Sequence, residues 1–141
     1  TLRIEAGLPC YGTELGADIT PLQAHIPDVI SSHHTGYIGE DVIKKQQQLG
    51  TETRRTGVII KEDGAIFNGA KLFSPDGREI GHITSHCFSP SIKQNIAQAS
   101  LSSEFAHPEK TILVDTGKRR LRACTHELNF IYPRTLTSPS A

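Results

Sequence analysis

The hydrophobic pattern of the chain changes near residue 53. Before this point apolar residues follow no sustained period, and Gly, Pro, Thr and His interrupt residues 8–39. After it, apolar and polar residues alternate in short segments that Gly and Pro separate, a pattern typical of half-buried strands. The sequence therefore predicts two regions, residues 1–50 with helices and loops, and residues 51–141 with strands.

The first region is predicted to contain two helices joined by a long ordered loop. Residues 2–6 favour a helix, and Gly7 would end it because glycine accepts the left-handed backbone of a C-cap. The second helix covers residues 40–49, with acids in its first turn and Gly50 just past its end. Residues 8–39 lie between them as a loop with short elements.

The second region is predicted to contain six short strands. They cover residues 55–60, 70–73, 78–84, 96–101, 111–114 and 119–125. Turn residues such as Pro75-Asp76-Gly77 separate them. Six strands with this spacing indicate a small barrel of Greek-key or jelly-roll type, so the fold class is an α+β fragment followed by an all-β domain. The Ser-, Thr- and Pro-rich tail from Thr135 is predicted to fray.

Charge and composition exclude several classes of partner. Fifteen Lys and Arg balance fifteen Asp and Glu, so no net field attracts nucleic acid or an anionic membrane. Lys118-Arg119-Arg120 with Arg122 is either a phosphate contact or, as we favour, a solvated strand end. Apolar runs such as Val58-Ile59-Ile60 are far shorter than the roughly 20 residues of a membrane span. Three cysteines without a CxxC pair indicate a reducing compartment rather than a disulfide framework.

The local motifs indicate no metal or nucleotide site. On a helix, His82 and His86 would share one face, but here the segment is strand-patterned and Pro90 follows it. We therefore predict that the chain binds no metal. No dinucleotide fingerprint, P-loop or nucleophile elbow occurs. A Cys/His nucleophile pair stays open, because it would have no local signature.

Three ordered segments carry a family resemblance. The first is LRIEAGLPCYG at residues 2–12, with Glu14-Leu15 and DITP at residues 18–21; the second is GYIG at residues 36–39 before a helix; the third is GREIGHITS at residues 77–85, with Phe88-Ser89-Pro90. Together they resemble the glycine-cleavage T-protein family, the aminomethyltransferases, over nearly the whole chain.

The resemblance implies a specific reaction and an incomplete catalyst. T-proteins have three domains around a central folate site; they take an aminomethyl group from the lipoyl arm of the H-protein, release ammonia and leave methylenetetrahydrofolate. This chain would supply the end of the second domain, residues 1–50, and the third domain, residues 51–141. The family's catalytic aspartate and its pterin-binding Glu and Arg would lie N-terminal to Thr1, so we assign no catalytic residue here.

The resemblance also implies partners, a location and candidate site residues. The partners would be the N-terminal part of the same protein, or another chain carrying it, and the lipoyl H-protein, in the mitochondrial matrix or the bacterial cytoplasm. Glu5, Tyr11 and Arg134 are the candidate contacts to tetrahydrofolate. Each has a structural alternative: Glu5 paired with Arg3 or solvated, Tyr11 packing the loop on the barrel, and Arg134 solvated in the tail.

Departures from the family pattern leave three functions open. The family's TPxEAGLxW run has Gln23 for an acid, His25 for a glycine and Asp28 for a tryptophan, with Pro27 breaking any helix there. In the segment that matches the family's TSG motif, His86 stands in place of the glycine. The chain is thus part of a working aminomethyltransferase, or a catalytically inactive T-protein-like subunit of a larger mitochondrial assembly. A dimethylglycine- or sarcosine-dehydrogenase-like protein is less favoured, because residues 8–12 have the T-protein form.

Overall fold

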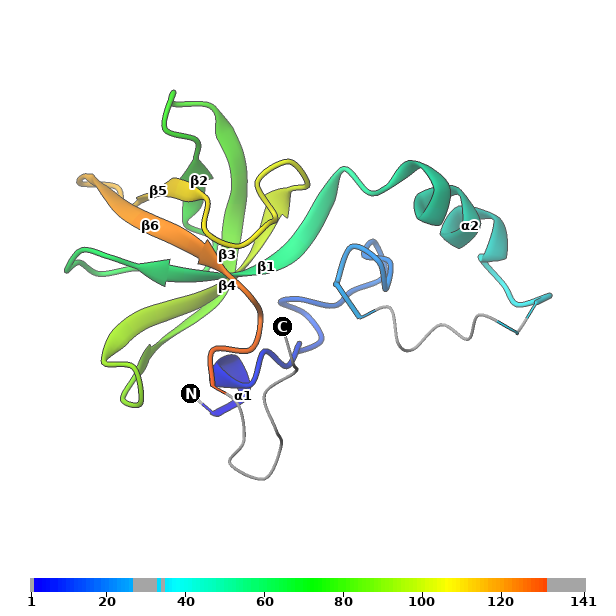
Figure 1. Cartoon of the computed structure of the whole chain (residues 1–141), viewed down its shortest axis with the longest axis horizontal. Helices are drawn as coiled ribbons and strands as arrows, with labels where there is room; N and C mark the ends of the chain where they lie inside the picture. The colour runs from blue at the N-terminus through cyan, green and yellow to red at the C-terminus, as the bar shows by residue number, and fades with distance from the viewer. Residues whose placement is uncertain (1, 27–32, 34, 132–141) are drawn as a thin grey trace.

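The computed structural model describes residues 2–26, 33 and 35–131, and its main body is a closed barrel of antiparallel strands (Figure 1). The strands are β1 (Thr53–Ile60), β2 (Lys71–Phe73), β3 (Glu79–Ser89), β4 (Gln94–Ser102), β5 (Thr111–Asp115) and β6 (Arg120–His126). Their order around the barrel is β1-β4-β3-β2-β5-β6. The predicted fold class is confirmed.

The strand order contains a Greek key. β2, β3 and β4 follow one another as antiparallel neighbours, and β5 returns to pair with β2. The spatial order β5-β2-β3-β4 is the Greek-key arrangement. β1 pairs with both β4 and β6 and so closes the barrel, which leaves no unpaired edge.

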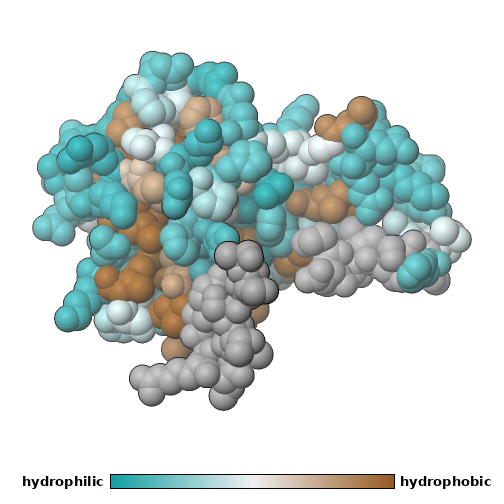
Figure 2. All heavy atoms as spheres, in the orientation of Figure 1, coloured by the Kyte–Doolittle hydropathy of each residue, from teal (hydrophilic) through white to brown (hydrophobic). Residues whose placement is uncertain are grey.

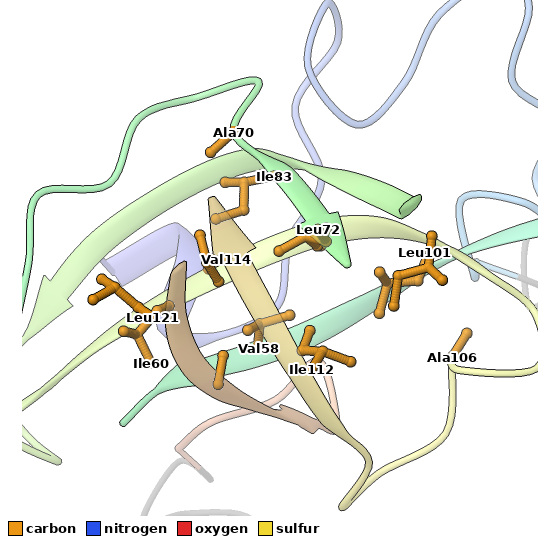
Figure 3. Close-up of a cluster of buried hydrophobic side chains, with 14 residues drawn as sticks. Val58, Ile60, Ala70, Leu72, Ile83, Leu101, Ala106, Ile112, Val114 and Leu121 are labelled. Atoms are coloured by element: carbon orange, nitrogen blue, oxygen red, sulfur yellow. The ribbon is translucent and has the colours of Figure 1, made fainter. Parts of the chain in front are cut away.

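The core lies inside the barrel and is built from aliphatic side chains of all six strands (Figure 3). Its fully buried members include Val58, Leu72, Ile83, Leu101, Ile112, Val114 and Leu121. Each such side chain contributes about 1.5–3 kcal/mol on burial. Ile4, Ile96 and Phe130 form a second cluster. This cluster joins the N-terminal helix to one end of the barrel.

β3 is longer than the sequence pattern predicts. We expected a strand over residues 78–84, whereas β3 continues to Ser89. The register against β4 shifts between Ile83 and Ser85, so that Ile83, Thr84 and Ser85 are buried in succession. A bulge of this kind interrupts the two-residue alternation. The prediction therefore ended the strand where the bulge begins.

The first region has the two predicted helices. α1 covers Leu2–Glu5 and contacts β3 and β4, and Gly7 follows it with φ 76°, as the predicted cap requires. α2 covers Glu40–Leu49 and projects away from the barrel (Figure 1). Within the described residues, no helix has the length and apolar character to cross a membrane.

Candidate functional site

Glu14 joins the N-terminal loop to the barrel. Its side chain is fully buried and forms an ion pair with Arg3, with 3.2 Å between Nη1 and Oε2. Its carboxylate also accepts hydrogen bonds from the Cys10 amide at 2.9 Å and from three hydroxyls, those of Thr13, Thr84 and Ser85. Burial raises the pKa of Glu14, but the hydrogen bonds outweigh it and hold the pKa below its ordinary value. Glu14 is therefore an ionised anchor.

Arg55 of β1 is a second buried anchor between the same two parts. Its Nη1 donates to the Gly7 carbonyl at 2.8 Å and to Gln98 Oε1 at 2.9 Å. Its Nε donates to the Ala24 carbonyl at 2.6 Å. Burial lowers the pKa of Arg55 to about 10, so the guanidinium stays charged at pH 7. Through these bonds β1 fixes two separate points of the loop.

Glu5 lies in neither of the alternative environments that the sequence suggested. The residue is buried, and its Oε1 accepts a hydrogen bond from the Ser89 hydroxyl at the end of β3. Arg3, the expected partner of Glu5, pairs with Glu14 instead. The expectation of a solvated or Arg3-paired charge is therefore wrong, because α1 turns Glu5 toward the barrel.

Tyr11 and Arg134 are the other two candidate folate contacts. Tyr11 is 76% exposed, so its ring does not pack the loop against the barrel as the alternative interpretation held. Arg134 lies outside the described residues. Of the three candidates, the structure therefore describes only Glu5, which faces the barrel, and Tyr11, which faces solvent.

The substitution of Gln23 for the family's acid has a structural explanation. The backbone amide of Gln23 donates to Thr20 Oγ1 at 3.2 Å, and the backbone amide of Thr20 donates to Gln23 Oε1 at 3.0 Å. This reciprocal pair is a capping box, in which Gln and Glu are equivalent. Pro21 follows Thr20 at the first position of the turn, where proline needs no amide hydrogen. The capping role therefore accounts for a side-chain oxygen at position 23, which either Gln or Glu supplies.

We expect Gln23→Ala to lower the unfolding free energy by about 1 kcal/mol, because the capping box is lost. Gln23→Glu restores the family's residue and should leave the stability within about 0.5 kcal/mol. Urea unfolding followed by circular dichroism measures both. Equal stability of the alanine variant and the native chain would show that the capping box does not form.

His25 occupies a backbone position that favours glycine. Its φ is 56°, in the left-handed region, where the family has a glycine. Its imidazole lines a groove of about 650 Å³ between the loop and the barrel, together with Arg54 and Arg55. Burial lowers the pKa of His25, and the positive charges of Arg54 and Arg55 lower it further. His25 is thus a neutral side chain at pH 7, set beside two cations.

The described residues offer no metal centre. Among them, no group of three or more His, Cys, Asp and Glu side chains converges as a metal ion would need. His86, the most suggestive candidate in the sequence, has its Nδ1 2.9 Å from Asn68 Oδ1.

Sequence reasoning assigned no role to Glu14 or Arg55. Glu14 stands in one of the matching segments, but its partners Thr84 and Ser85 are about seventy residues away in the chain. One feature of the sequence pointed to this contact. Glu14 and its partners Thr84 and Ser85 stand in two segments that both match the same family. Buried polar pairs of this kind are visible only once the fold brings the segments together.

Comparisons with known proteins agree with this architecture. The family model described as the glycine cleavage T-protein C-terminal barrel domain matches residues 53–131. The aminomethyltransferase of Geobacillus sp. (strain WCH70) is 38% identical over 124 residues, which are 87% of this chain and 34% of that protein. The aminomethyltransferase of Caldanaerobacter subterraneus subsp. tengcongensis is 36% identical over 130 residues, 92% of this chain and 34% of that protein.

A solved structure gives the same result. The crystal structure of glycine cleavage system aminomethyltransferase T from Bartonella henselae superposes with a TM-score of 0.85 at 25% identity, over 92% of this chain and 37% of that one. The chain thus spans about a third of the length of the curated relatives that it matches. It belongs to the glycine-cleavage T-protein family and corresponds to the C-terminal portion, which includes the barrel domain.

Proposed function

We propose that this chain acts as the C-terminal part of a folate-dependent aminomethyltransferase of the glycine cleavage system. The reaction would transfer the aminomethyl carbon from the lipoyl H-protein to tetrahydrofolate and release ammonia. The chemistry would need the N-terminal two thirds that the relatives possess, in the same polypeptide or in another. This division is supported by the relatives, which are aminomethyltransferases about three times as long as this chain.

The main support for this proposal is the attachment of the loop after α1, which matches the family, to the barrel. Glu14 and Arg55 hold residues 3–24 against β1, β3 and β4 through buried charged hydrogen bonds. Charged hydrogen bonds contribute about 1.5–3 kcal/mol each, so they fix the position of the loop on the barrel. In this arrangement Tyr11 faces outward and offers its ring to a folate cavity whose other walls belong to the missing part.

The exposed hydrophobic residues support the need for a further N-terminal part. Nine large hydrophobic side chains are exposed in the described part of the chain, and seven of them lie between Leu2 and Leu49. Figure 2 shows hydrophobic atoms at the surface over α2 and beside it. An exposed apolar surface of this kind is typical of an interaction site. The seven side chains are Leu2, Leu8, Tyr11, Ile19, Ile38, Val42 and Leu49.

Two of the candidate folate contacts keep distinct roles in this proposal. Ser89 binds Oε1 of Glu5, so Glu5 would contact the ligand through Oε2. Arg134 would pair with the glutamyl carboxylate of the folate as a guanidinium–carboxylate pair.

We expect the 141-residue chain alone to bind tetrahydrofolate more weakly than about 1 mM, because one wall of a cavity cannot offset the cost of immobilising the ligand. Adding a separately expressed N-terminal part should restore micromolar binding and formation of methylenetetrahydrofolate. Titration calorimetry and a turnover assay with lipoyl H-protein measure the two results. Micromolar binding to the chain alone would contradict the proposal.

The second candidate is a T-protein-like structural subunit without activity. His25 favours it, because an imidazole projects into the groove beside the loop, where the family's glycine leaves space. The recombination experiment separates the two candidates. A recombined pair that binds tetrahydrofolate but does not turn over would indicate the structural subunit, and His25→Gly would then be the first substitution to test for recovery of activity.

A further inference from the structure

The groove beside β1 has the size of a ligand site. It measures about 650 Å³ and lies between the loop after α1, the start of β1 and the segment that follows β6. Ligand sites commonly measure about 300–1,000 Å³ and combine an apolar lining with a few polar groups. The lining here has that mixed character, with Leu8, Ile26 and Leu128 among its apolar members.

Arg54 is the group in this groove that lacks a partner. Its neighbour Arg55 uses Nε and Nη1 to bind loop carbonyls and Gln98. The backbone of Arg54 pairs with β4, but its side chain has no hydrogen bond or ion pair within the described residues, and its Nε is buried without a hydrogen-bond partner. Buried polar atoms without partners are rare in folded proteins, and one of their ordinary explanations is a ligand or ion that completes the site.

The charges around Arg54 favour a negative ligand. Arg55 and Arg54 come from β1, His25 from the loop, and His126 and Glu127 from the end of β6. His126 places its Nδ1 2.8 Å from the Glu127 carbonyl and stacks on Phe130, with 5.1 Å between ring centroids. Glu127 is the one acidic residue among the described groups that line the groove, against two arginines. An anion would therefore meet an excess of positive charge.

We propose that the groove binds an oxyanion ligand, a carboxylate or a phosphate, through the guanidinium of Arg54. The planar fork of Arg matches both kinds of group, and a charged hydrogen bond to Nε would satisfy the buried donor. The inference concerns the barrel side of the loop and does not depend on the proposed aminomethyl transfer.

His25 makes the site sensitive to pH. Its pKa is lowered by burial first and by Arg54 and Arg55 second, so it is neutral at pH 7. A bound anion would favour the imidazolium and raise that pKa. By linkage, the anion binds more tightly as the pH falls through the titration of His25.

Titration of the ¹⁵N-labelled 141-residue chain tests the site. The Arg54 Nε–H signal is the readout in the native chain, and the backbone amide signals of the groove residues Gly7 and Leu128 are the readout shared with the variants. Sodium glutarate and inorganic phosphate are the two probes, each added to about 50 mM against sodium chloride at matched ionic strength. We expect a saturable shift with a Kd of about 1–10 mM. The probe with the lower Kd identifies the group as carboxylate or phosphate.

Two variants locate the binding. Arg54→Gln should weaken it by about tenfold or more, because the charged contact is lost. Arg122→Gln is the matched control, since Arg122 is an exposed arginine of β6, outside the groove, whose side chain lies beside Glu62. Thermal unfolding confirms that both variants are folded. The absence of a saturable shift with either probe, or a Kd in Arg54→Gln equal to that of the native chain, would overturn the proposal.

Discussion

Gly81→Ala is expected to destabilise the barrel by about 3–5 kcal/mol, a large part of the stability of a domain of this size. Gly81 lies near the start of β3, with Leu72 of β2 on one side and Leu101 of β4 on the other. A Cβ at this position would lie 2.0 Å from the Ser100 carbonyl oxygen and 3.0 Å from the Leu101 Cα. These are backbone atoms of the neighbouring strand, so β3 and β4 would have to separate.

Urea unfolding of the Gly81→Ala chain, followed by circular dichroism, measures this effect. Gly16→Ala is the matched control, because its added Cβ meets no atom within 4 Å and its backbone is not left-handed. We expect Gly16→Ala to stabilise the chain slightly, by about 0.4–1 kcal/mol, through the unfolded state. If Gly81→Ala unfolded at the same urea concentration as the native chain, the register of β3 against β4 would be wrong.

The predicted helices and strands agree with the structure wherever local chemistry decides the outcome. Glu40 in the first turn and Gly50 past the end fixed the bounds of α2. The strand period failed at Thr84, because the bulge in β3 buries three successive residues. A bulge depends on the partner strand, so the alternation within one segment could not reveal it.

The site was less accessible to sequence reasoning than the fold. The resemblance pointed to Glu5 as a contact, but its burial against Ser89 depends on the end of β3, eighty-four residues away. The capping box of Thr20 and Gln23 is local and has a fixed spacing, so the sequence pattern could have revealed it, although we predicted none there. A buried charge has no such local signal, because its partners come from distant strands. Glu14 is the clearest case.

Glu14→Ala is expected to lower the unfolding free energy by about 2–4 kcal/mol at pH 7, because its buried carboxylate accepts several hydrogen bonds. The substitution leaves Arg3 without its carboxylate and leaves the hydroxyl of Ser85 without an acceptor in a buried place, whereas the Thr84 hydroxyl keeps the Gln98 carbonyl at 3.0 Å. Such unsatisfied groups cost more than the pair itself contributed. Glu79→Ala is the control, because Glu79 is exposed and pairs with the exposed Lys71 at 3.7 Å. Its effect should stay within about 0.5 kcal/mol.

The same carboxylate gives the chain a defined acid sensitivity. Burial raises the pKa of Glu14, but its hydrogen bonds lower it further, so the folded chain holds the proton less tightly than the unfolded chain, whose value is 4.5. The stability that Glu14 contributes is therefore complete above pH 4.5 and is lost as the pH falls through the lower folded pKa. Glu14→Gln cannot titrate, so its stability should fall less steeply below pH 4.5 than that of the native chain. Urea midpoints measured between about pH 7 and pH 3 decide this, and parallel curves for the two chains would contradict the assignment.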